Sequence, residues 1–280
     1  MPELPEAETI ARELHRRLVG ATLGRVTVLR ADVIHGDPRP LSRMLPGKRV
    51  IRVGRRAKRV IVTLDPATEL TFHLGMSGRL TVTPKDDPVE KHTHLRIEFP
   101  GLDAELRFRD PRRFGGVWCH VDDAGRQVKP KGRTLGEVGI EPLDAKPAAF
   151  LRLLQRRRQI KALLLDQRVI AGIGNIYCDE SLYAASIHPL TRADGLGDDR
   201  GRALLRSIKA TLNRAIRFNG STLMDYRRAD GTEGSFQKHH RVYQREGKPC
   251  RRCGTPIQRI LAAGRSTFFC PACQARDTST

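Results

Sequence analysis

Long apolar runs are missing from this sequence. No stretch approaches the roughly 18 consecutive apolar residues that a membrane-spanning helix requires. The opening residues, MPELPEAE, contain neither the basic segment nor the apolar segment of an export signal, and no lipidation motif stands at either end. We therefore expect a cytoplasmic protein that has no membrane partner.

Acidic residues are in the minority. The 280 residues include 31 Asp and Glu against 51 Lys and Arg, which gives a net charge of +20. Such a surface attracts polyanions, so nucleic acid is the first partner to expect and the nucleoid the expected location. An acidic membrane surface is the less favoured alternative. The length and the 39% hydrophobic content suffice for two modest domains, each with its own core.

Cysteine is scarce except near the C-terminus. Two of the six cysteines stand alone, and the other four form the pattern Cys250-x2-Cys253, sixteen residues, Cys270-x2-Cys273. This spacing fits a tetrahedral site in which four thiolates enclose one zinc ion and leave no position for substrate. We expect one structural Zn2+ per chain, with an iron–sulfur cluster as the alternative.

Hydrophobic periodicity indicates an α+β protein of several parts. Apolar residues at 7, 10, 11, 14 and 18 predict a first helix, which ends near Gly20. Short β-rich runs broken by Gly, Pro and Asp occupy about 22–120 and suggest a sandwich or barrel. Helical spacing follows, and its longest run places apolar residues at 204, 205, 208, 212 and 216 on one helix face.

Two segments interrupt these patterns. Residues 121–148 are rich in Gly, Pro and charge, which is typical of a linker. Residues 219–245 have few periodic apolar positions, and we interpret them as a mobile, lid-like loop. The expected division of the chain is 2–130 for an N-terminal sandwich domain, 131–148 for the linker, 149–240 for a helical domain with the lid-like loop 219–240, and 241–275 for the zinc finger.

Two shorter patterns suit contacts with phosphate. In GIGNIYCDES, at 172–181, Asn175 is the expected N-cap of a helix whose first N–H groups and dipole would face an anion. An ordinary Gly-rich turn with a capping Asn is an equally good interpretation. Between the cysteine pairs, AAGRSTFF predicts a hairpin with Arg265 near its tip, either as a phosphate contact or as a solvated surface arginine.

The N-terminus offers a nucleophile. Once Met1 is removed, Pro2 carries a secondary amine that, as the free base, could attack a sugar C1′ and form an iminium ion. That electron sink would acidify the C2′ proton and permit strand cleavage by elimination. Glu3 and Glu6 could supply or shuttle protons. Alternatively, the two carboxylates only complement the helix dipole and the prolines only begin the helix.

Six motifs in order resemble those of the formamidopyrimidine-DNA glycosylase family across nearly the whole chain. These are MPELPEAET, RRAK ending in Lys58, HLGMSG at 73–78, DPRRFGG at 110–116, GIGNIY at 172–177 and the zinc hairpin. The resemblance implies an N-terminal β-sandwich with a flanking helix, a helix–two-turn–helix domain and a zinc-finger hairpin. It also implies a monomer that binds double-stranded DNA containing an oxidised base or an abasic site.

The same resemblance implies a role for each matching residue. Pro2 would be the Schiff-base nucleophile, Glu3 the acid that opens the sugar, Lys58 an acid–base partner of the elimination and Glu6 a supporting carboxylate. Arg265 would hold the phosphate beside the lesion and assist the second elimination.

Further matches concern DNA binding. Met76, Arg112 and Phe114 match residues that fill the gap left by a flipped nucleotide, although Met76 and Phe114 could simply be core residues. His92 and Asn175 match contacts to the DNA backbone. Two departures are Arg156–Arg158, which replace a lysine-rich tract, and Gln244, which replaces a glycine. Arg156 is the best match to a DNA-contacting lysine.

The resemblance implies a bifunctional glycosylase and lyase that removes oxidised purines and cuts the strand by β,δ-elimination. The closest alternative is an endonuclease VIII-like enzyme for oxidised pyrimidines, but the PELPE start favours the purine enzyme. A non-catalytic damage-binding protein and a zinc-ribbon transcription factor are alternatives of another class. Intact Pro2, Glu3 and Lys58 argue against the former, and the absence of an obvious recognition helix argues against the latter.

Overall fold

The structure, a computed structural model, describes residues 2–36, 40–65, 67–121 and 136–276. It contains two compact units. The N-terminal unit comprises Met1–Gly136 with Phe218–Ser235, and the helical unit comprises Glu137–Arg217 with Phe236–Thr280. The sequence placed 219–240 wholly in the helical domain, whereas most of this loop groups with the N-terminal unit. Residues 131–135 of the expected linker lie outside the described residues, and its remainder, 136–148, is described.

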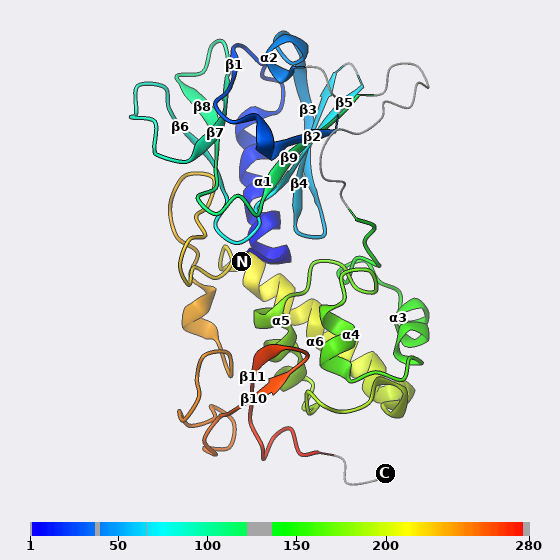
Figure 1. Cartoon of the computed structure of the whole chain (residues 1–280). Coiled ribbons are helices and arrows are strands. Elements are labelled where there is room, and N and C mark those ends of the chain that lie inside the picture. Colours follow the sequence, from blue (N-terminus) through cyan, green and yellow to red (C-terminus); the bar gives the residue numbers. More distant parts are fainter. Residues whose placement is uncertain (1, 37–39, 66, 122–135, 277–280) are drawn as a thin grey trace. The chain divides into compact units, whose positions relative to one another are not determined.

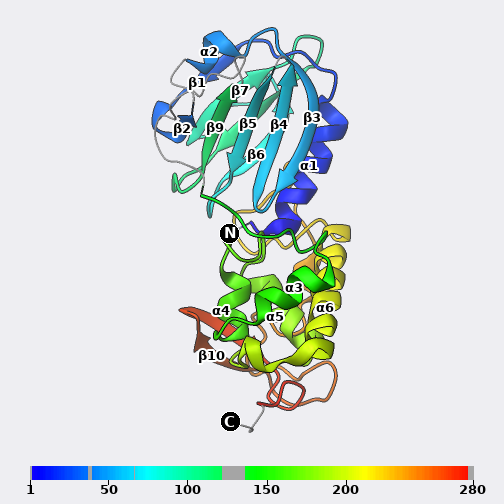
Figure 2. The ribbon, with the colours of Figure 1, turned by 90° about the vertical axis from the view of Figure 1, so that its right-hand side faces the viewer.

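The N-terminal unit is a sandwich of two sheets, as the β-rich runs predict (Figure 2). Its neighbouring strands are antiparallel except for the pair β2–β9. One continuous core joins both sheets to the first helix. The first sheet has the order β2 (Ile34–Gly36), β9 (Gly116–Val121), β5 (Thr68–His73), β4 (Arg59–Asp65), β3 (Arg49–Arg56), and the second has the order β1 (Val26–Val28), β7 (Thr93–Glu98), β8 (Ala104–Arg109), β6 (Arg79–Pro84). Short helices η1 (Ala31–Val33) and α2 (Leu41–Met44) connect strands.

Helix α1 (Leu4–Leu18) packs along β3, and its apolar positions are buried as the spacing predicts. Gly20 follows it with φ of +91°, which glycine adopts without strain. Glu8 pairs with Arg55 near the end of β3 at 2.9 Å. The Gly20 N–H donates to the Val50 carbonyl, near the start of β3, at 2.8 Å. The start of α1 therefore lies where β3 turns into β4.

Three connections leave the first sheet at that same end. Arg59, His73 and Gly116 are cross-strand neighbours on β4, β5 and β9. The β3–β4 turn, the segment 74–78 after β5 and the segment 110–115 before β9 therefore emerge side by side. The last two segments continue into β6 and β8 of the other sheet. Figures 1 and 2 show these turns near the N-terminal end of α1.

Residues 218–235 are built into the N-terminal unit. Tyr226 and Ala229 belong to its core, although the sequence predicts a loop with little to bury. The Val82 N–H donates to the Ala229 carbonyl at 2.7 Å, and Arg228 forms an ion pair with Glu13 of α1. The Ala229 N–H also donates to the Glu13 carboxylate at 2.9 Å. Two apolar side chains and one buried carboxylate therefore fix a segment whose sequence has no periodic pattern.

The helical unit confirms the helical periodicity (Figure 1). Its longest helix, α6, buries the apolar face predicted at 204, 205, 208, 212 and 216. A two-stranded hairpin follows near the C-terminus. The helices are α3 (Pro147–Leu154), α4 (Ile160–Leu165), α5 (Asn175–Ala184), η2 (Ala193–Gly195), α6 (Gly197–Arg217) and η3 (Phe236–His239), and the hairpin strands are β10 (Gln258–Ala262) and β11 (Arg265–Phe269).

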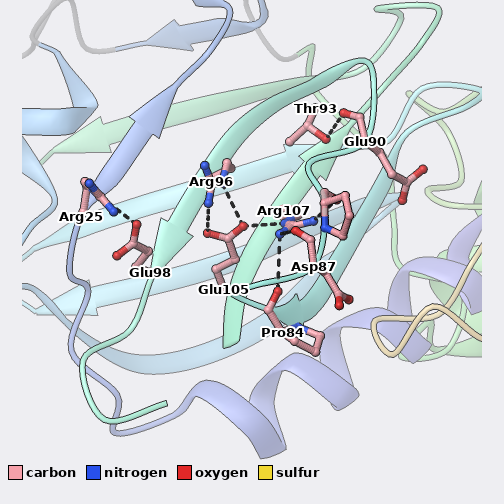
Figure 3. A network of polar contacts seen from close by, with 10 residues as sticks. Arg25, Pro84, Asp87, Glu90, Thr93, Arg96, Glu98, Glu105 and Arg107 are labelled. Carbon is pink, nitrogen blue, oxygen red and sulfur yellow. Dashed lines mark hydrogen bonds and ion pairs between the residues drawn. The ribbon is translucent and has the colours of Figure 1, made fainter. Parts of the chain in front are cut away.

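A buried ionic network supports the second sheet (Figure 3). The fully buried carboxylate of Glu105 accepts hydrogen bonds from Arg96 at 2.8 and 2.9 Å and another from Arg107. Arg107 also donates to the carbonyls of Asp87 at 2.7 Å and Pro88 at 2.9 Å. Because every charge in it has a partner, the network fixes the loop between β6 and β7.

We expect Glu105→Gln to lower the free energy of unfolding by about 3 kcal/mol, because the guanidinium of Arg107 would stay buried without a carboxylate. Urea denaturation measures this loss. Glu98→Gln is the matched control, because its partner Arg25 has a side chain that is 76% exposed; its loss should stay below about 1 kcal/mol. Equal losses in the two variants would contradict this account.

Candidate active site and metal centre

Pro2, Glu3 and Glu6 form a buried group at the start of α1. Pro2 is buried, and Glu3 and Glu6 are only 3% and 2% exposed. Glu3 is the N-cap, and the two glutamates form a capping box in which the Glu3 N–H donates to Glu6 Oε2 at 2.8 Å. Burial of both carboxylates exceeds what simple complementarity with the helix dipole requires.

The second oxygen of Glu6 binds the segment 218–235. Glu6 Oε1 accepts the N–H of Ser221 at 2.7 Å. Gly220, with φ of +77°, lies so close that a Cβ there would stand 2.7 Å from the same oxygen. Only glycine fits this position without displacing the carboxylate. The sequence assigns no role to Gly220 or Ser221, because their partner is about two hundred residues away.

Lys58 lies in the β3–β4 turn, directly after Ala57, whose φ is +55°. It is 8% exposed, so most of its side chain is buried. Arg55, which pairs with Glu8 of α1, also donates to the Ala57 carbonyl at 3.0 Å. This contact joins the turn to the first part of α1. The fold thus brings Pro2, the two glutamates and Lys58 to one end of the N-terminal unit.

The buried carboxylate of Asp110 holds the two neighbouring connections, 74–78 and 110–115. It accepts the hydroxyl of Ser77 at 2.6 Å and the N–H of Gly115 at 2.7 Å. At Gly75 a Cβ would lie 2.4 Å from the Gly115 nitrogen, so the two segments are in close contact. The sequence analysis missed Asp110, although it stands inside the DPRRFGG motif.

The three residues that the resemblance assigns to gap filling lie on these connections. Met76 is 40% exposed and Phe114 is 48% exposed, so the alternative that they are core residues is wrong. The Arg112 guanidinium lies over the Phe114 ring at 4.7 Å from its centroid. Exposed large apolar side chains beside an arginine suit insertion into a stack of bases.

His92 is exposed at the end of the loop that Arg107 supports. Its φ is +70°, and its carbonyl accepts the Asp110 N–H at 3.1 Å. Slight desolvation and then the positive charges of Lys91 and Arg109 lower the pKa of its ring. The ring is therefore neutral at neutral pH, and its N–H group can donate to an anion.

In the helical unit, α5 anchors the hairpin. Gly174, not Asn175, is the N-cap, so the sequence prediction of the capping residue is wrong by one position. Both residue types suit a cap, and the Asn175 amide is instead used to donate to the Ser266 carbonyl at 2.8 Å. Asp179 accepts the Phe268 N–H at 2.9 Å. Strand β11 is thus fixed along α5 by two side chains.

Asp179 is also paired with Lys161 of α4, to which the sequence analysis gave no role. The Lys161 Nζ lies 2.5 Å from Asp179 Oδ1, and both side chains are fully buried. Burial raises the pKa of the Asp179 carboxyl, and Lys161 opposes that rise. The neighbouring Glu180 accepts the backbone N–H groups of residues 241–243. Asp179 and Glu180 are the only charged residues of α5, and this is the signal that could have revealed the contacts.

Arg265 is exposed and follows the hairpin turn, where Ala263 and Gly264 have φ of +50° and +68°. Its position near the tip agrees with the sequence prediction. Arg156 is exposed in the connection between α3 and α4. Gln244 has φ of +55°, a conformation that favours the glycine it replaces and costs a residue with a Cβ about 1 kcal/mol.

The four cysteines lie together at the end of the hairpin. Their Sγ atoms are all within 4.8 Å of one another, and two of the separations are 3.5 and 3.9 Å. A tetrahedron with Zn–S bonds of about 2.3 Å needs S–S separations of about 3.8 Å. The residues therefore fit zinc, and four thiolates leave it no open position. They are Cys250, Cys253, Cys270 and Cys273.

Comparison with known proteins identifies the family. Residues 1–117 match the formamidopyrimidine-DNA glycosylase N-terminal domain, residues 138–227 match the helix–two-turn–helix domain of the same enzymes, and residues 247–276 match the zinc finger found in them and in isoleucyl-tRNA synthetase. The chain belongs to the formamidopyrimidine-DNA glycosylase family. Membership confirms the expected fold class and, with the cysteine geometry, one structural zinc ion.

Individual members of the family align over nearly the whole chain. The formamidopyrimidine-DNA glycosylases of Herpetosiphon aurantiacus and Roseiflexus are 42% and 44% identical, with 98% of this chain and 100% of each relative covered. The MutM (Fpg) crystal structure from Thermus thermophilus is 38% identical, covers 99% of this chain and 100% of its own, and has a TM-score of 0.83. The Lactococcus lactis Fpg complex with abasic-site DNA is 34% identical, covers 98% and 100%, and has a TM-score of 0.85.

Within the described ranges, no helix is both long and apolar enough to cross a membrane.

We expect Cys253→Ser to lose zinc and DNA affinity together, because three thiolates hold the ion less well and the hairpin depends on it. Elemental analysis and a DNA-binding titration measure the two losses. Cys119→Ser, a buried cysteine of the N-terminal unit, is the control that should keep its zinc. Full lesion binding by metal-free Cys253→Ser would refute the structural role.

Proposed function

We propose that this chain is a bifunctional DNA glycosylase and abasic-site lyase that removes oxidised purines, such as 8-oxoguanine and formamidopyrimidines, from double-stranded DNA. The observation that carries the proposal is the placement of Pro2. This residue is buried beside the Glu3–Glu6 capping box, at the end of the sandwich that also bears Lys58 and the exposed Met76. Family membership supplies the reaction class, and the protein would act on DNA in the cytoplasm, at the nucleoid.

In the first step, the free amine of Pro2 attacks C1′ of the damaged nucleotide. The bond from C1′ to the base breaks, and the base leaves with a proton. Glu3, adjacent to the nucleophile, protonates the ring oxygen so that the sugar opens and the nitrogen lone pair forms an iminium ion. Glu3 is adjacent to Pro2 in the chain and is 3% exposed, so its carboxyl lies beside the nucleophile in a largely water-free position.

Strand cleavage follows from the iminium. Removal of a C2′ proton expels the 3′ phosphate by β-elimination, and a second elimination expels the 5′ phosphate. Water then hydrolyses the remaining iminium and releases Pro2. Lys58 is the proposed acid–base partner in proton transfer, since it is largely buried in a turn at the same end of the unit as Pro2. Arg265 would hold the phosphate that leaves in the second elimination.

Glu6 is proposed as a positioning residue. Its two oxygens bind the N–H groups of Glu3 and Ser221, so it fixes the backbone beside the nucleophile and the segment 218–235 at once. Met76, Arg112 and Phe114 are proposed to fill the gap that the flipped nucleotide leaves. Flipping costs a few kcal/mol, and an apolar filler with a hydrogen-bonding arginine offsets part of that cost.

The remaining contacts are proposed to be with phosphate, which fixes register without reading sequence. His92 would contribute its ring N–H and Arg156 its exposed guanidinium. Asn175, in the first turn of α5, would contact the backbone where the helix dipole is positive. The zinc ion holds the hairpin that bears Arg265 and takes part in no chemical step.

An endonuclease VIII-like activity on oxidised pyrimidines is the second candidate. Against it stand the exposed set Met76, Arg112 and Phe114, which matches the purine enzyme, and relatives named as formamidopyrimidine-DNA glycosylases. A related MutM has been solved with DNA that contains carbocyclic 8-oxo-G.

We expect the protein to cut a duplex with 8-oxoguanine opposite cytosine and to be trapped on it by borohydride, because reduction fixes the iminium. Pro2→Gly should lose most of the trapped complex. A thymine-glycol duplex, run beside it, should be a poorer substrate. Cutting only at thymine glycol would favour the second candidate, and absence of trapping on either duplex would indicate a non-catalytic DNA-binding protein.

We expect Lys58→Ala to slow base removal more for some lesions than for others, because the residue acts in proton transfer. Single-turnover rates on 8-oxoguanine and on a preformed abasic site separate base removal from elimination. Lys48→Ala, in the same unit before β3, is a control for lost positive charge. Wild-type rates for Lys58→Ala on both substrates would remove Lys58 from the site.

A further inference from the structure

A basic pocket of about 370 Å³ lies in the helical unit, apart from the residues proposed for the reaction. It is formed by the second half of α5, by α6, by η3 and by the first cysteine pair. Four arginines line it, one or two from each of three segments distant in sequence. They are Arg214, Arg241, Arg251 and Arg252.

The four arginines of this pocket outnumber the one acid in its lining. Among the described residues, the side chains of Arg241 and Arg251 have no hydrogen bond or ion pair. Arg252 donates to the hydroxyl of Ser186 at 2.7 Å and to the Tyr183 carbonyl at 3.4 Å, and both partners are neutral. The acid in the lining, Glu180, is buried and uses its carboxylate to accept the backbone N–H groups of residues 241–243. The pocket therefore presents guanidinium groups to an incoming anion.

The pKa of His239 is lowered by burial and by the positive charges of this pocket. Its ring lines the pocket, and its pKa is lowered first by burial and then by Arg214, Arg251 and Arg241. The ring of His239 is thus close to guanidinium groups from α6, from the segment after η3 and from the first cysteine pair. Like charges that converge repel one another, and a bound anion reduces that repulsion.

Aromatic side chains shape the pocket. Phe236 and Tyr183 contribute to its lining, and the Arg252 guanidinium stacks over the Tyr183 ring at 4.6 Å from the centroid. Stacking limits the rotation of the guanidinium, and its five N–H donors exceed the two hydrogen bonds that it makes. Planar forks of this kind bind phosphate through paired hydrogen bonds.

The pocket is distinct from the proposed DNA contact of the same helix. Tyr183 follows Asn175 by eight residues, which corresponds to about 12 Å along α5. It therefore lies at the opposite end of α5 from the N-terminal turn.

We propose that this pocket is a second anion site, which binds a phosphoryl group either of a free phosphate compound or of a nucleic-acid backbone. The proposal does not depend on the glycosylase activity. Binding would stabilise the packing of η3, α6 and the first cysteine pair against α5.

The test uses the full-length, zinc-loaded protein and inorganic pyrophosphate, with isothermal titration calorimetry as the readout. The pocket variant Arg241→Gln/Arg251→Gln removes two guanidiniums that have no hydrogen-bond or ion-pair partner to lose among the described residues. The control Arg206→Gln/Arg276→Gln removes the same charge from exposed positions outside the pocket. We expect the pocket variant to weaken pyrophosphate binding at least about tenfold and the control to change it less than about twofold.

A fluorescein-labelled, undamaged single strand distinguishes the two sources of phosphate. If the pocket variant also binds this strand more weakly than the control does, the site serves a nucleic-acid backbone; if only pyrophosphate binding falls, it serves a free phosphate compound. Equal weakening in both variants would show a general charge effect and overturn the proposal. So would the absence of saturable pyrophosphate binding by the parent protein. Unchanged zinc content of the pocket variant shows that it is folded. If the double variant misfolds, the single variant Arg241→Gln replaces it in both titrations.

Discussion

The carboxylate of Glu6 is the constraint on which the N-terminal end of the sandwich depends. One oxygen binds the N–H of Glu3 and the other binds the N–H of Ser221, so a single buried side chain fixes two chain segments that are far apart in sequence. Each oxygen has a backbone donor, which offsets the cost of burying the charge. A shorter or neutral side chain could not satisfy both. A Cβ at position 220 would lie 2.7 Å from this carboxylate, so the arrangement depends on glycine at that position.

The same solution recurs elsewhere in the molecule. Asp110 joins the segments 74–78 and 110–115, Asp179 joins α5 to β11, and Glu180 joins α5 to residues 241–243. In each case a buried acid binds backbone or side-chain donors from a segment outside its own helix or strand. A chain of net charge +20 thus reserves several of its few acids for internal contacts, and most arginines stay at the surface. The use of these acids inside the protein therefore both fixes the buried segments and leaves the surface positively charged.

How far the sequence predicts this structure depends on the range of each interaction. Apolar spacing predicts α1 and α6, and the cysteine spacing predicts the metal site, because neighbours in the pattern are neighbours in space. The resemblance locates Pro2 and Lys58, but it takes the strand register to show that they share one end of the sheet. The packing of Tyr226 and Ala229 could not be predicted, since their partners lie on α1 and β6. The N-cap of α5 was predicted one position too late, at Asn175 instead of Gly174, because glycine and asparagine both suit a helix cap.

The membership of Tyr226 and Ala229 in the N-terminal core has a consequence for synthesis. A ribosome that has released the first 136 residues has delivered every strand of the sandwich but not the two side chains that complete its core. Until residue 229 emerges, Glu13 and one oxygen of Glu6 have no partner from that segment. The proposed nucleophile, Pro2, is therefore made first, yet its surroundings are completed only after residues 137–217 of the helical unit have been translated. Catalytic competence is delayed until late in translation by the path of the chain itself.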